Sequence, residues 1–392
     1  MQKATQQQTK EHNTDLVLST IFRHEVISRA EIARITSLTR TTVSDIVSDL
    51  IAEGLVNEVG IGPSIGGKSP ILLGLAEDSR YLIGLDLSYE EFRGAIVNLR
   101  GEIREKVSLP INNHCTGSES LGVVYSVLDK LVSTPRRPLV GIGIGTPGLI
   151  NTREGIVVTA VNLDWKNLPL ARLLQDRYRL PVAILNDSQA SAMAEYSFGA
   201  AVPAETNLVV VNVRRGIGAG IIIHGQLFQG DGGGAGEIGH VVVAQEKGLL
   251  CHCGNTGCLE TVASAQAVIQ RVQAANDQAG GRPGEITLEW LVEAFKSGNP
   301  LVQQVVLEAG RYLGQAIAAL VGTLNIHKIV LTGVMTQFGK AWLAVVQGTM
   351  AQATLSMLAE DTRVEISRLG ENGILLGASA LLLKDYSLLY RL

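Results

Sequence analysis

The sequence has no surplus of basic residues, no long apolar run and few cysteines. Lysine and arginine together number 33 against 37 acidic residues, and the formal net charge is −4. A histone-like or polybasic membrane-surface protein needs an overall basic field, so any contact with nucleic acid must be local. No apolar run reaches the roughly 18 residues that span a bilayer. The opening segment MQKATQQQTKEHNTD also lacks the apolar core of a signal peptide. These absences predict a cytoplasmic protein without membrane insertion.

Apolar residues make up 46% of the 392 residues, whereas charged residues make up 18%. Such a composition can bury sizeable cores and argues against intrinsic disorder. A chain of this length is expected to form two or three domains. Because the sequence also has no low-complexity tract and no short tandem repeat, we expect an ordered protein of several domains.

The beginning of the chain shows the spacing of three short helices. Residues 1–15 are polar and lack periodicity, and we interpret them as a frayed or DNA-dependent arm, with order beginning near Thr14. Apolar residues then recur at helical spacing. This periodicity predicts helices that start at Leu16 and that cover residues 29–35 and 37–53. The second and third have the spacing of a helix-turn-helix.

Two short strands are predicted after these helices, on either side of the glycine-rich turn GIGPSIGGK. Three helices and a two-stranded wing make a winged helix-turn-helix, which we assign to residues 1–76. The start of its last helix would face the major groove of DNA. The candidate DNA-contacting residues are Thr39, Arg40, Thr41, Thr42 and Ser44 on this helix and Lys68 in the wing.

The charge of this domain argues against DNA binding. Residues 1–75 contain 7 basic and 8 acidic side chains, which is a poor electrostatic footprint for a DNA-binding domain. A helical module that binds another protein is therefore the alternative interpretation.

The rest of the chain alternates strands and helices in two similar halves. An antiparallel meander is predicted over residues 81–110 and is followed by a helix and a buried strand at 139–145. A similar plan restarts near Asn207, helices dominate residues 261–326, and a terminal helix is predicted over 373–384. This alternation predicts an α/β body.

Three of the four cysteines lie within eight residues of one another. Cys251, Cys253 and Cys258 follow His240 in the string GEIGHVVVAQEKGLLCHCGNTGCLE. This is the spacing of a metal site rather than of a disulfide framework. One imidazole nitrogen and three sulfur atoms fill the tetrahedral shell of Zn²⁺ and leave no position for an activated water. We predict one structural zinc ion per chain. His252 could replace His240, and the alternative is a group of unrelated buried thiols.

Polar residues also follow a buried strand and flank the cysteine segment. Asn186 and Asp187 come directly after the strand predicted at 182–185, where α/β folds place ligand-binding groups. Glu237 and Glu260 lie on either side of the cysteines. Together with the histidine they suit a polyhydroxylated ligand, because a hydroxyl group can donate to a carboxylate and accept from an amide. An aspartate there could also be the general base for a sugar hydroxyl. Taken singly, each acid is more often a surface residue or a helix cap.

Five motifs together resemble the ROK family, which groups sugar-responsive repressors with sugar kinases. They are GIGIGTPGLI (141–150), LNDSQASAMAE (185–195), GIGAGIII (216–223), GEIGH (236–240) and CHCGNTGCLE (251–260). The winged helix and its GGKSPILL segment resemble the repressor branch, especially its xylose-repressor-like members.

This resemblance implies an α/β body with the two-lobed, actin-like fold of the hexokinase type, which is a ribonuclease H-like ATPase fold. The lobes would cover residues 77–186 and 187–392, and the C-terminal helix would return to the first lobe. The family's sugar contacts map onto Asn186, Asp187, Glu237, His240 and Glu260, and Asp187 matches the catalytic base of the kinases. In zinc-bearing members the histidine binds the metal with one nitrogen and faces the sugar with the other.

Three elements of the nucleotide site depart from the kinase pattern. The kinases have an aspartate followed by Gly-Gly-Thr after the first strand, where this chain has DLSYEE (86–91). A second phosphate loop, usually Gly-Thr, is Arg214-Arg215 here, and Val334 follows Gly333 where a second glycine is usual. Side chains in place of glycines and added carboxylates disfavour a bound phosphate. We therefore expect no enzyme activity and interpret Asp187 as a sugar ligand.

The sequence thus predicts a DNA-binding transcriptional repressor of carbohydrate-use genes, with xylose among the candidate sugars and the sugar bound between the lobes. A homodimer or homotetramer would place two recognition helices about 34 Å apart on a pseudo-palindromic operator in double-stranded DNA. One alternative is a ROK kinase that phosphorylates a hexose with ATP and carries a DNA-binding domain. The other is a sugar-sensing adaptor that binds a protein through residues 1–75.

Overall fold

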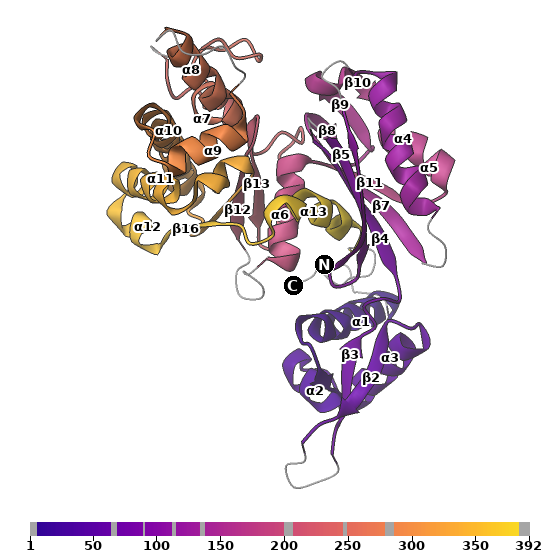
Figure 1. Ribbon diagram of the computed structural model, residues 1–392. Helices are drawn as coiled ribbons and strands as arrows, with labels where there is room; N and C mark the ends of the chain where they lie inside the picture. Colours follow the sequence, from indigo (N-terminus) through magenta and orange to yellow (C-terminus); the bar gives the residue numbers. More distant parts are fainter. Residues whose placement is uncertain are drawn as a thin grey trace. The chain divides into compact units, whose positions relative to one another are not determined.

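The computed structural model divides into two compact units (Figure 1). The first unit runs to Asp187 and takes in the end of the chain from Ile374, and the second comprises most of the chain between Ser188 and Gly373. The residues that the structure describes are 6–63, 69–88, 91–111, 115–133, 138–199, 207–245, 249–278 and 286–383.

The first unit begins with a winged helix-turn-helix (Figure 1, indigo). Its helices are α1 (Gln6–Arg23), α2 (Arg29–Thr36) and α3 (Arg40–Ala52), and its wing strands are β2 (Val56–Ile61) and β3 (Ile71–Leu75). The two-residue strand β1 (Ile27–Ser28) pairs with β3, so the sheet has three strands and not the predicted two. Periodicity could not reveal so short a strand, because two residues carry no alternation.

The first helix begins earlier than the sequence predicts. We expected a frayed arm up to Thr14, but α1 already starts at Gln6. Glutamine, lysine and glutamate are good helix formers, and Lys10 Nζ also lies 3.1 Å from Asp49 Oδ2 of α3. The apolar pattern gave no sign of this segment because its exposed turns carry no apolar residues to repeat.

Capping residues fix the ends of the next two helices. Ser28 and Glu31 form a capping box at the start of α2. The prediction that the third helix starts at residue 37 is wrong, because Ser37 has a φ of 57° and ends α2 instead. Thr39 Oγ1 accepts a hydrogen bond from Thr42 N at 3.1 Å, and α3 therefore begins at Arg40.

A five-stranded sheet forms the centre of the rest of the first unit. Strands β4 (Tyr81–Leu87), β5 (Glu91–Asn98) and β6 (Ile103–Pro110) make an antiparallel meander. Strands β7 (Leu139–Thr146) and β11 (Val182–Asn186) extend it in parallel on the other side of β4, in the order β11-β7-β4-β5-β6. Beside it lies a three-stranded sheet that the sequence did not predict, formed by β8 (Leu149–Asn151), β9 (Ile156–Ala160) and β10 (Trp165–Leu168).

Helices cover both faces of this sheet. Helices α4 (Ser118–Val132) and α5 (Leu170–Tyr178) lie on one face, and α13 (Gly373–Leu382) lies on the other (Figure 1). Glycines allow α13 to approach closely, since a Cβ atom on Gly143 would lie 1.8 Å from Ala378 O. The end of the chain therefore packs against strands that are more than 200 residues earlier.

The second unit repeats the same plan. Strands β12 (Leu208–Val213), β13 (Ile217–Ile223) and β14 (Gln226–Phe228) form the meander, and β15 (Lys328–Thr332) and β16 (Arg363–Ile366) add in parallel beside β12. The order is β14-β13-β12-β15-β16. The helices are α6 (Asp187–Phe198), α7 (Glu260–Ala263), α8 (Ala265–Gln278), α9 (Leu288–Lys296), α10 (Pro300–Leu324), α11 (Gly339–Ala353) and α12 (Ser356–Asp361).

Helix α10 has the length and hydropathy that a membrane span requires, although it contains no long uninterrupted apolar run. Over half of its most apolar window, 56%, is buried inside the structure. Its small residues allow α11 to pack closely, since a Cβ atom on Gly310 would lie 3.2 Å from Trp342 Cδ1. We therefore interpret α10 as a core helix of the second unit.

Candidate functional site

His240 and three cysteines lie together in the second unit. One nitrogen of His240 and the Sγ atoms of Cys251, Cys253 and Cys258 all lie within 4.8 Å of one another. His240 Nδ1 is 3.6 Å from Cys251 Sγ, and Cys253 Sγ is 3.6 Å from Cys258 Sγ. A tetrahedron with Zn–S bonds of about 2.3 Å has edges of about 3.8 Å, so this spacing fits one Zn²⁺ ion. The cluster can hold a metal ion.

The sequence left open whether His240 or His252 is the fourth ligand, and the structure distinguishes the two. His252 Nδ1 lies 4.0 Å from Cys251 Sγ, but this residue groups with His240 and Glu260 rather than with all three cysteines. Among the described residues, the geometry therefore favours His240 over His252 as the fourth member of the cysteine cluster.

Tight backbone turns bring the cluster together. Cys251 N donates to Asn255 O at 2.7 Å, and Gly254 N donates to Cys251 O at 2.9 Å. Gly257 has a φ of +79°, and a Cβ atom on it would lie 2.3 Å from Ala244 O. His240 ends the short helix η2 (Ile238–His240), which packs on β13 so closely that a Cβ atom on Gly239 would lie 2.1 Å from Ile217 O. Close backbone contacts thus explain the glycines of both motifs.

The thiols of the cluster differ in how readily they ionise. Burial raises the pKa of Cys258 to about 12 and also raises the pKa of Cys251. A hydrogen bond from the backbone of Asn255 lowers the pKa of the exposed Cys253. A bound divalent cation would favour the thiolate forms and offset the effect of burial. The donor set therefore suits a metal ion better than it suits isolated thiols.

Two carboxylates face the histidines beside this cluster. His240 Nε2, the ring nitrogen that does not face Cys251, lies 3.9 Å from Glu237 Oε2. Glu260 opens α7 and is 16% exposed; its Oε1 lies 3.4 Å from His252 Nδ1, and its Oε2 accepts a hydrogen bond from Ile217 N at 3.0 Å. His240 can thus face a metal ion with Nδ1 and a second ligand with Nε2.

Asn186 and Asp187 belong to the first unit, whereas Glu237, His240 and Glu260 belong to the second. Asn186 is the last residue of β11, and its Nδ2 donates to Gly148 O at 3.0 Å. Asp187 opens α6, where the helix dipole favours a carboxylate. Both side chains are half-buried. Each unit thus presents polar side chains at the positions that the sequence singled out.

Arg93, which no sequence pattern singled out, pairs with Asp86. Arg93 on β5 lies directly opposite Asp86 on β4, and Arg93 Nη2 is 2.5 Å from Asp86 Oδ2. The two side chains are 6% and 1% exposed. Ser88 Oγ also donates to Asp86 Oδ1, whereas residues 89 and 90 of the DLSYEE run lie outside the described residues. A single arginine in the apolar strand EFRGAIVN was the available signal, because buried charges are almost always paired.

Two further turns that depart from the kinase pattern have backbone contacts within the second unit. Arg214 N donates to Gly216 O, and Arg214 O accepts from Ala265 N, both at 2.9 Å. Gly333 has a φ of +93°, and a Cβ atom on it would lie 2.4 Å from Val213 O. Val334 then begins the short helix η3 (Val334–Phe338).

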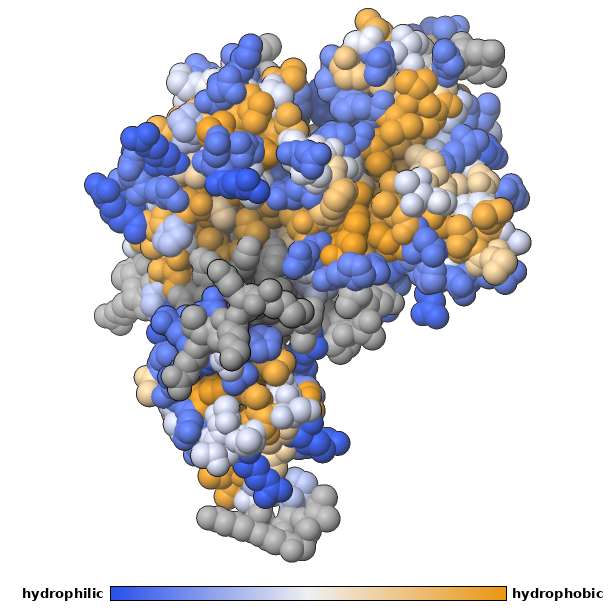
Figure 2. Space-filling model, turned by 180° about the vertical axis from the view of Figure 1, so that it is seen from behind, coloured by the Kyte–Doolittle hydropathy of each residue, from blue (hydrophilic) through white to orange (hydrophobic). Residues whose placement is uncertain are grey.

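The candidate DNA contacts gather at the start of α3. Thr39, Arg40 and Thr41 are exposed, whereas Thr42 and Ser44 are half-buried. Thr39 and Thr42 also serve the helix cap, with their Oγ1 atoms 2.9 Å apart. Polar and apolar residues are interspersed on the face of this domain that Figure 2 shows (lower part). Lys68 lies outside the described residues, so Arg40 is the one cation among the described candidates.

Comparison with known proteins identifies the family. Residues 82–385 match the model of the ROK family. The chain belongs to the ROK family. Ahead of this ROK region, residues 12–57 match a winged helix-turn-helix DNA-binding model. The chain is 33% identical to the "Xylose repressor" of Caldicellulosiruptor bescii over 388 residues, which cover 96% of each protein.

Solved ROK structures show the same architecture. A ROK family transcriptional regulator described as a homolog of the E. coli MLC protein has a TM-score of 0.82 and 28% identity, over 97% of this chain and 98% of its own. A ROK glucokinase from Streptomyces griseus, in complex with glucose and AMPPNP, has a TM-score of 0.68 and 27% identity. It covers 77% of this chain and 98% of its own. The predicted family and the predicted fold, a winged helix-turn-helix followed by an actin-like body, are confirmed.

Proposed function

We propose that this ROK protein is a DNA-binding transcriptional repressor of carbohydrate-use genes whose DNA affinity responds to a small sugar. The supporting observation is the extent of the likeness. The xylose repressor matches the chain over 96% of its length, including the winged helix, whereas the glucokinase matches 77% of it. Xylose is therefore the first candidate sugar, and other pentoses and hexoses follow.

We assign the sugar contacts to Asn186, Asp187, Glu237, His240 and Glu260. Carboxylates, an amide and an imidazole are the groups that hydroxyls of a sugar need as partners. The direction of His240 supports this assignment, because its Nε2 faces Glu237 while its Nδ1 faces Cys251.

We further propose one structural zinc ion per chain, held by His240, Cys251, Cys253 and Cys258. Their mutual distances of up to 4.8 Å support a closed tetrahedral shell. The metal would neutralise thiolate charge and fix the loop that carries His240. The protein's own groups would orient His240 and bind the sugar. These are the backbone turns that orient His240 and the carboxylates that receive the sugar hydroxyls.

The chain is not a kinase in this proposal. Asp86, which matches the aspartate at the kinase phosphate loop, is buried against Arg93, so its charge is already paired inside the protein. Without a positioned phosphate donor, Asp187 has no reaction to assist and binds the sugar instead. A sugar kinase that also carries a winged helix is the second candidate, because a ROK glucokinase shares the body fold.

The remaining assignments follow from this function. The DNA contacts would be Thr39, Arg40, Thr41, Thr42, Ser44 and Lys68. A homodimer or homotetramer in the cytoplasm would bind a pseudo-palindromic operator, because two-fold symmetry in the protein matches two half-sites in DNA. The domains would cover residues 1–76, 77–186 and 187–392.

The test is fluorescence anisotropy of the zinc-loaded protein on DNA fragments selected from the genome that encodes it. The titration is repeated with D-xylose and with a panel of other pentoses, hexoses, amino sugars and disaccharides. We expect nanomolar, sequence-specific binding that one sugar changes at least about tenfold, which corresponds to about 1.4 kcal/mol.

Two variants sharpen this test. Arg40→Ala should weaken specific binding about tenfold or more, since a base contact is worth about 1 to 3 kcal/mol. Arg172→Ala, which removes the same charge from an exposed position on α5, should bind like the wild type. Absence of specific binding with every sugar would contradict the proposal, and phosphate transfer from ATP to a sugar would then establish the kinase.

A further inference from the structure

Arg100 joins the body of the first unit to its winged helix. It lies in the turn after β5, and its guanidinium donates to Phe22 O through Nη1 and to His24 O through Nη2, the latter at 3.1 Å. The guanidinium carbon also lies 5.3 Å from the centroid of the Phe22 ring. These carbonyls are at the C-terminal end of α1, where the helix dipole attracts a cation. Arg100 thus caps a helix of the DNA-binding domain from outside that domain.

A second arginine makes the same kind of contact with α3. Arg80, the residue before β4, donates from Nη2 to Glu53 O at 3.2 Å, and Glu53 is the C-cap of α3. Its other terminal nitrogen donates to Ser79 O at 2.8 Å. We call Arg80 and Arg100 the arginine clamp, because each binds the C-terminal end of one helix of the winged domain.

The turn that carries Arg100 is fixed to the sheet. The side chain of Asn98 is fully buried, and its Oδ1 accepts hydrogen bonds from Arg100 N at 3.0 Å and from Glu102 N at 2.9 Å. Asn98 Nδ2 donates to Glu102 Oε2 at 2.9 Å. Because Asn98 is the last residue of β5, a movement of this strand would move Arg100 with it.

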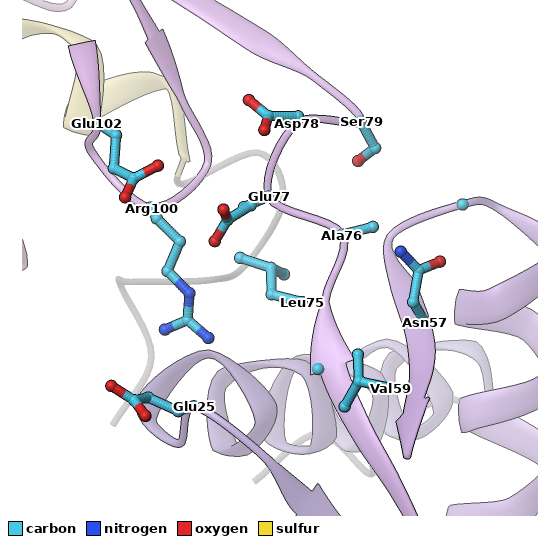
Figure 3. A pocket seen from close by; sticks show the side chains of 12 residues that line it. Glu25, Asn57, Val59, Leu75, Ala76, Glu77, Asp78, Ser79, Arg100 and Glu102 are labelled. Carbon is cyan, nitrogen blue, oxygen red and sulfur yellow. The ribbon is translucent and has the colours of Figure 1, made fainter. Parts of the chain in front are cut away.

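Most of the residues that line the junction around Arg100 are polar or charged. A cavity of about 910 Å³ lies there, and Arg100 extends into it between Glu25 and Glu77 (Figure 3). Burial lowers the pKa of Arg100, and the charges of Glu77, Glu25 and Glu102 oppose that effect, so the guanidinium stays charged. Directed hydrogen bonds from Arg80 and Arg100 cross this junction.

We propose that the arginine clamp couples the state of the body to the recognition helix, with Arg100 as its main positioning residue. This inference rests on the proposed function, because the state that it transmits is the sugar-bound one. A sugar can shift DNA affinity only if the two states differ in energy at the winged domain. A clamp that holds the ends of α1 and α3 in one state and releases them in the other supplies that difference.

The test uses the full-length, zinc-loaded protein with Arg100→Met, which keeps side-chain length and removes the hydrogen bonds and the charge. Arg100→Lys keeps the charge but loses the forked geometry. The matched control is Arg177→Met in the same unit. Arg177 likewise donates a hydrogen bond, to Asp129 Oδ2 at 2.8 Å, and its guanidinium carbon lies 4.6 Å from the centroid of the Tyr125 ring. Circular dichroism and thermal unfolding establish that each variant is folded.

DNA affinity is measured by anisotropy with and without D-xylose, and then with the other panel sugars if D-xylose has no effect. Sugar affinity is measured by calorimetry. We expect the sugar effect on DNA affinity to fall from about tenfold or more in the wild type to less than about threefold in Arg100→Met, with sugar affinity unchanged. Arg100→Lys should lie between them, and Arg177→Met should match the wild type.

Hydrogen exchange supplies a readout that needs no DNA. Backbone amides at the end of α1 should exchange at least about threefold faster in Arg100→Met than in Arg177→Met. A wild-type sugar effect that persists in Arg100→Met, or exchange that does not change, overturns the clamp. A wild-type protein with no sugar effect on DNA binding instead contradicts the proposed function.

Discussion

The two five-stranded sheets share one topology, but charged side chains contact their first hairpins in different ways. In the first unit, the β4–β5 hairpin buries the pair of Asp86 and Arg93 at 1% and 6% exposure. In the second unit, the β12–β13 hairpin receives a carboxylate from elsewhere in the chain, because Glu260 accepts a hydrogen bond from Ile217 N at 3.0 Å. Glu260 keeps its other oxygen toward His252, beside the cysteine cluster.

The difference shows how one scaffold supports two outcomes. Both hairpins have the same place in the strand order. The carboxylate of the first hairpin, Asp86, is already paired with Arg93. Glu260, which bonds to the second hairpin, is 16% exposed. In this chain the two hairpins thus share their strand order and differ in the side chains that contact them.

The largest effect is expected from breaking the buried pair. Arg93→Met leaves the Asp86 carboxylate buried without its main cation, and we expect a loss of about 3 to 5 kcal/mol in the free energy of unfolding, measured by urea denaturation. The double variant Asp86→Asn with Arg93→Met should recover part of this loss, because no charge is then left unpaired. Arg172→Met, at an exposed arginine of the same unit, should change stability by less than about 1 kcal/mol. An Arg93→Met protein as stable as this control would show that the pair is not important for the fold.

The metal cluster gives the next prediction. Cys258→Ser should reduce bound zinc from about one ion per chain to nearly none, measured by atomic emission after dialysis, because a closed shell needs all four ligands. Sugar affinity should fall at least about tenfold as the loop that carries His240 loosens. Cys115→Ser is the matched control, since Cys115 is a half-buried free cysteine outside the cluster. Full sugar affinity without metal would contradict the role assigned to the cluster.

A smaller effect is expected at Glu260. Glu260→Gln keeps an oxygen that can accept from Ile217 N but removes the charge. We therefore expect sugar affinity to fall about tenfold, or about 1.4 kcal/mol, with zinc content unchanged. Calorimetric titration measures it, and Glu293→Gln, at an exposed side chain of the same unit, serves as control. An unchanged affinity would remove Glu260 from the sugar site.

The smallest effect is expected from the glycine beside Glu260. A Cβ atom on Gly216 would lie 2.5 Å from Glu260 Oε2, at the end of a side chain that can move. Gly216→Ala should therefore change stability by less than about 1 kcal/mol and reduce sugar affinity about threefold. Gly322→Ala, where a Cβ atom meets nothing within 4 Å on helix α10, should leave sugar affinity unchanged and raise stability slightly. Equal sugar affinities in the two variants would show that the position of Glu260 does not matter.

Elements with a clear hydrophobic period and ligands with a clear spacing could be predicted from the residues alone. The antiparallel meander predicted over residues 81–110 is found as β4, β5 and β6. The cysteine spacing likewise predicted a metal cluster, and the fold brings its four members together. Local periodicity and short spacings were enough here, because the information lies within a few residues.

The pairings between distant residues depend on the three-dimensional fold. Arg93 meets Asp86 through strand register, His240 rather than His252 completes the cysteine group through the turns at Gly239 and Gly257, and Arg100 reaches a carbonyl 78 residues earlier in the chain. The short strands β1 and β16 also form through pairing with β3 and β15, because their own residues show no clear pattern. A buried charge needs a charged partner, and a backbone group at the end of a helix or strand needs a hydrogen-bond partner. Which residue supplies that partner depends on which distant segments of the chain the fold brings together.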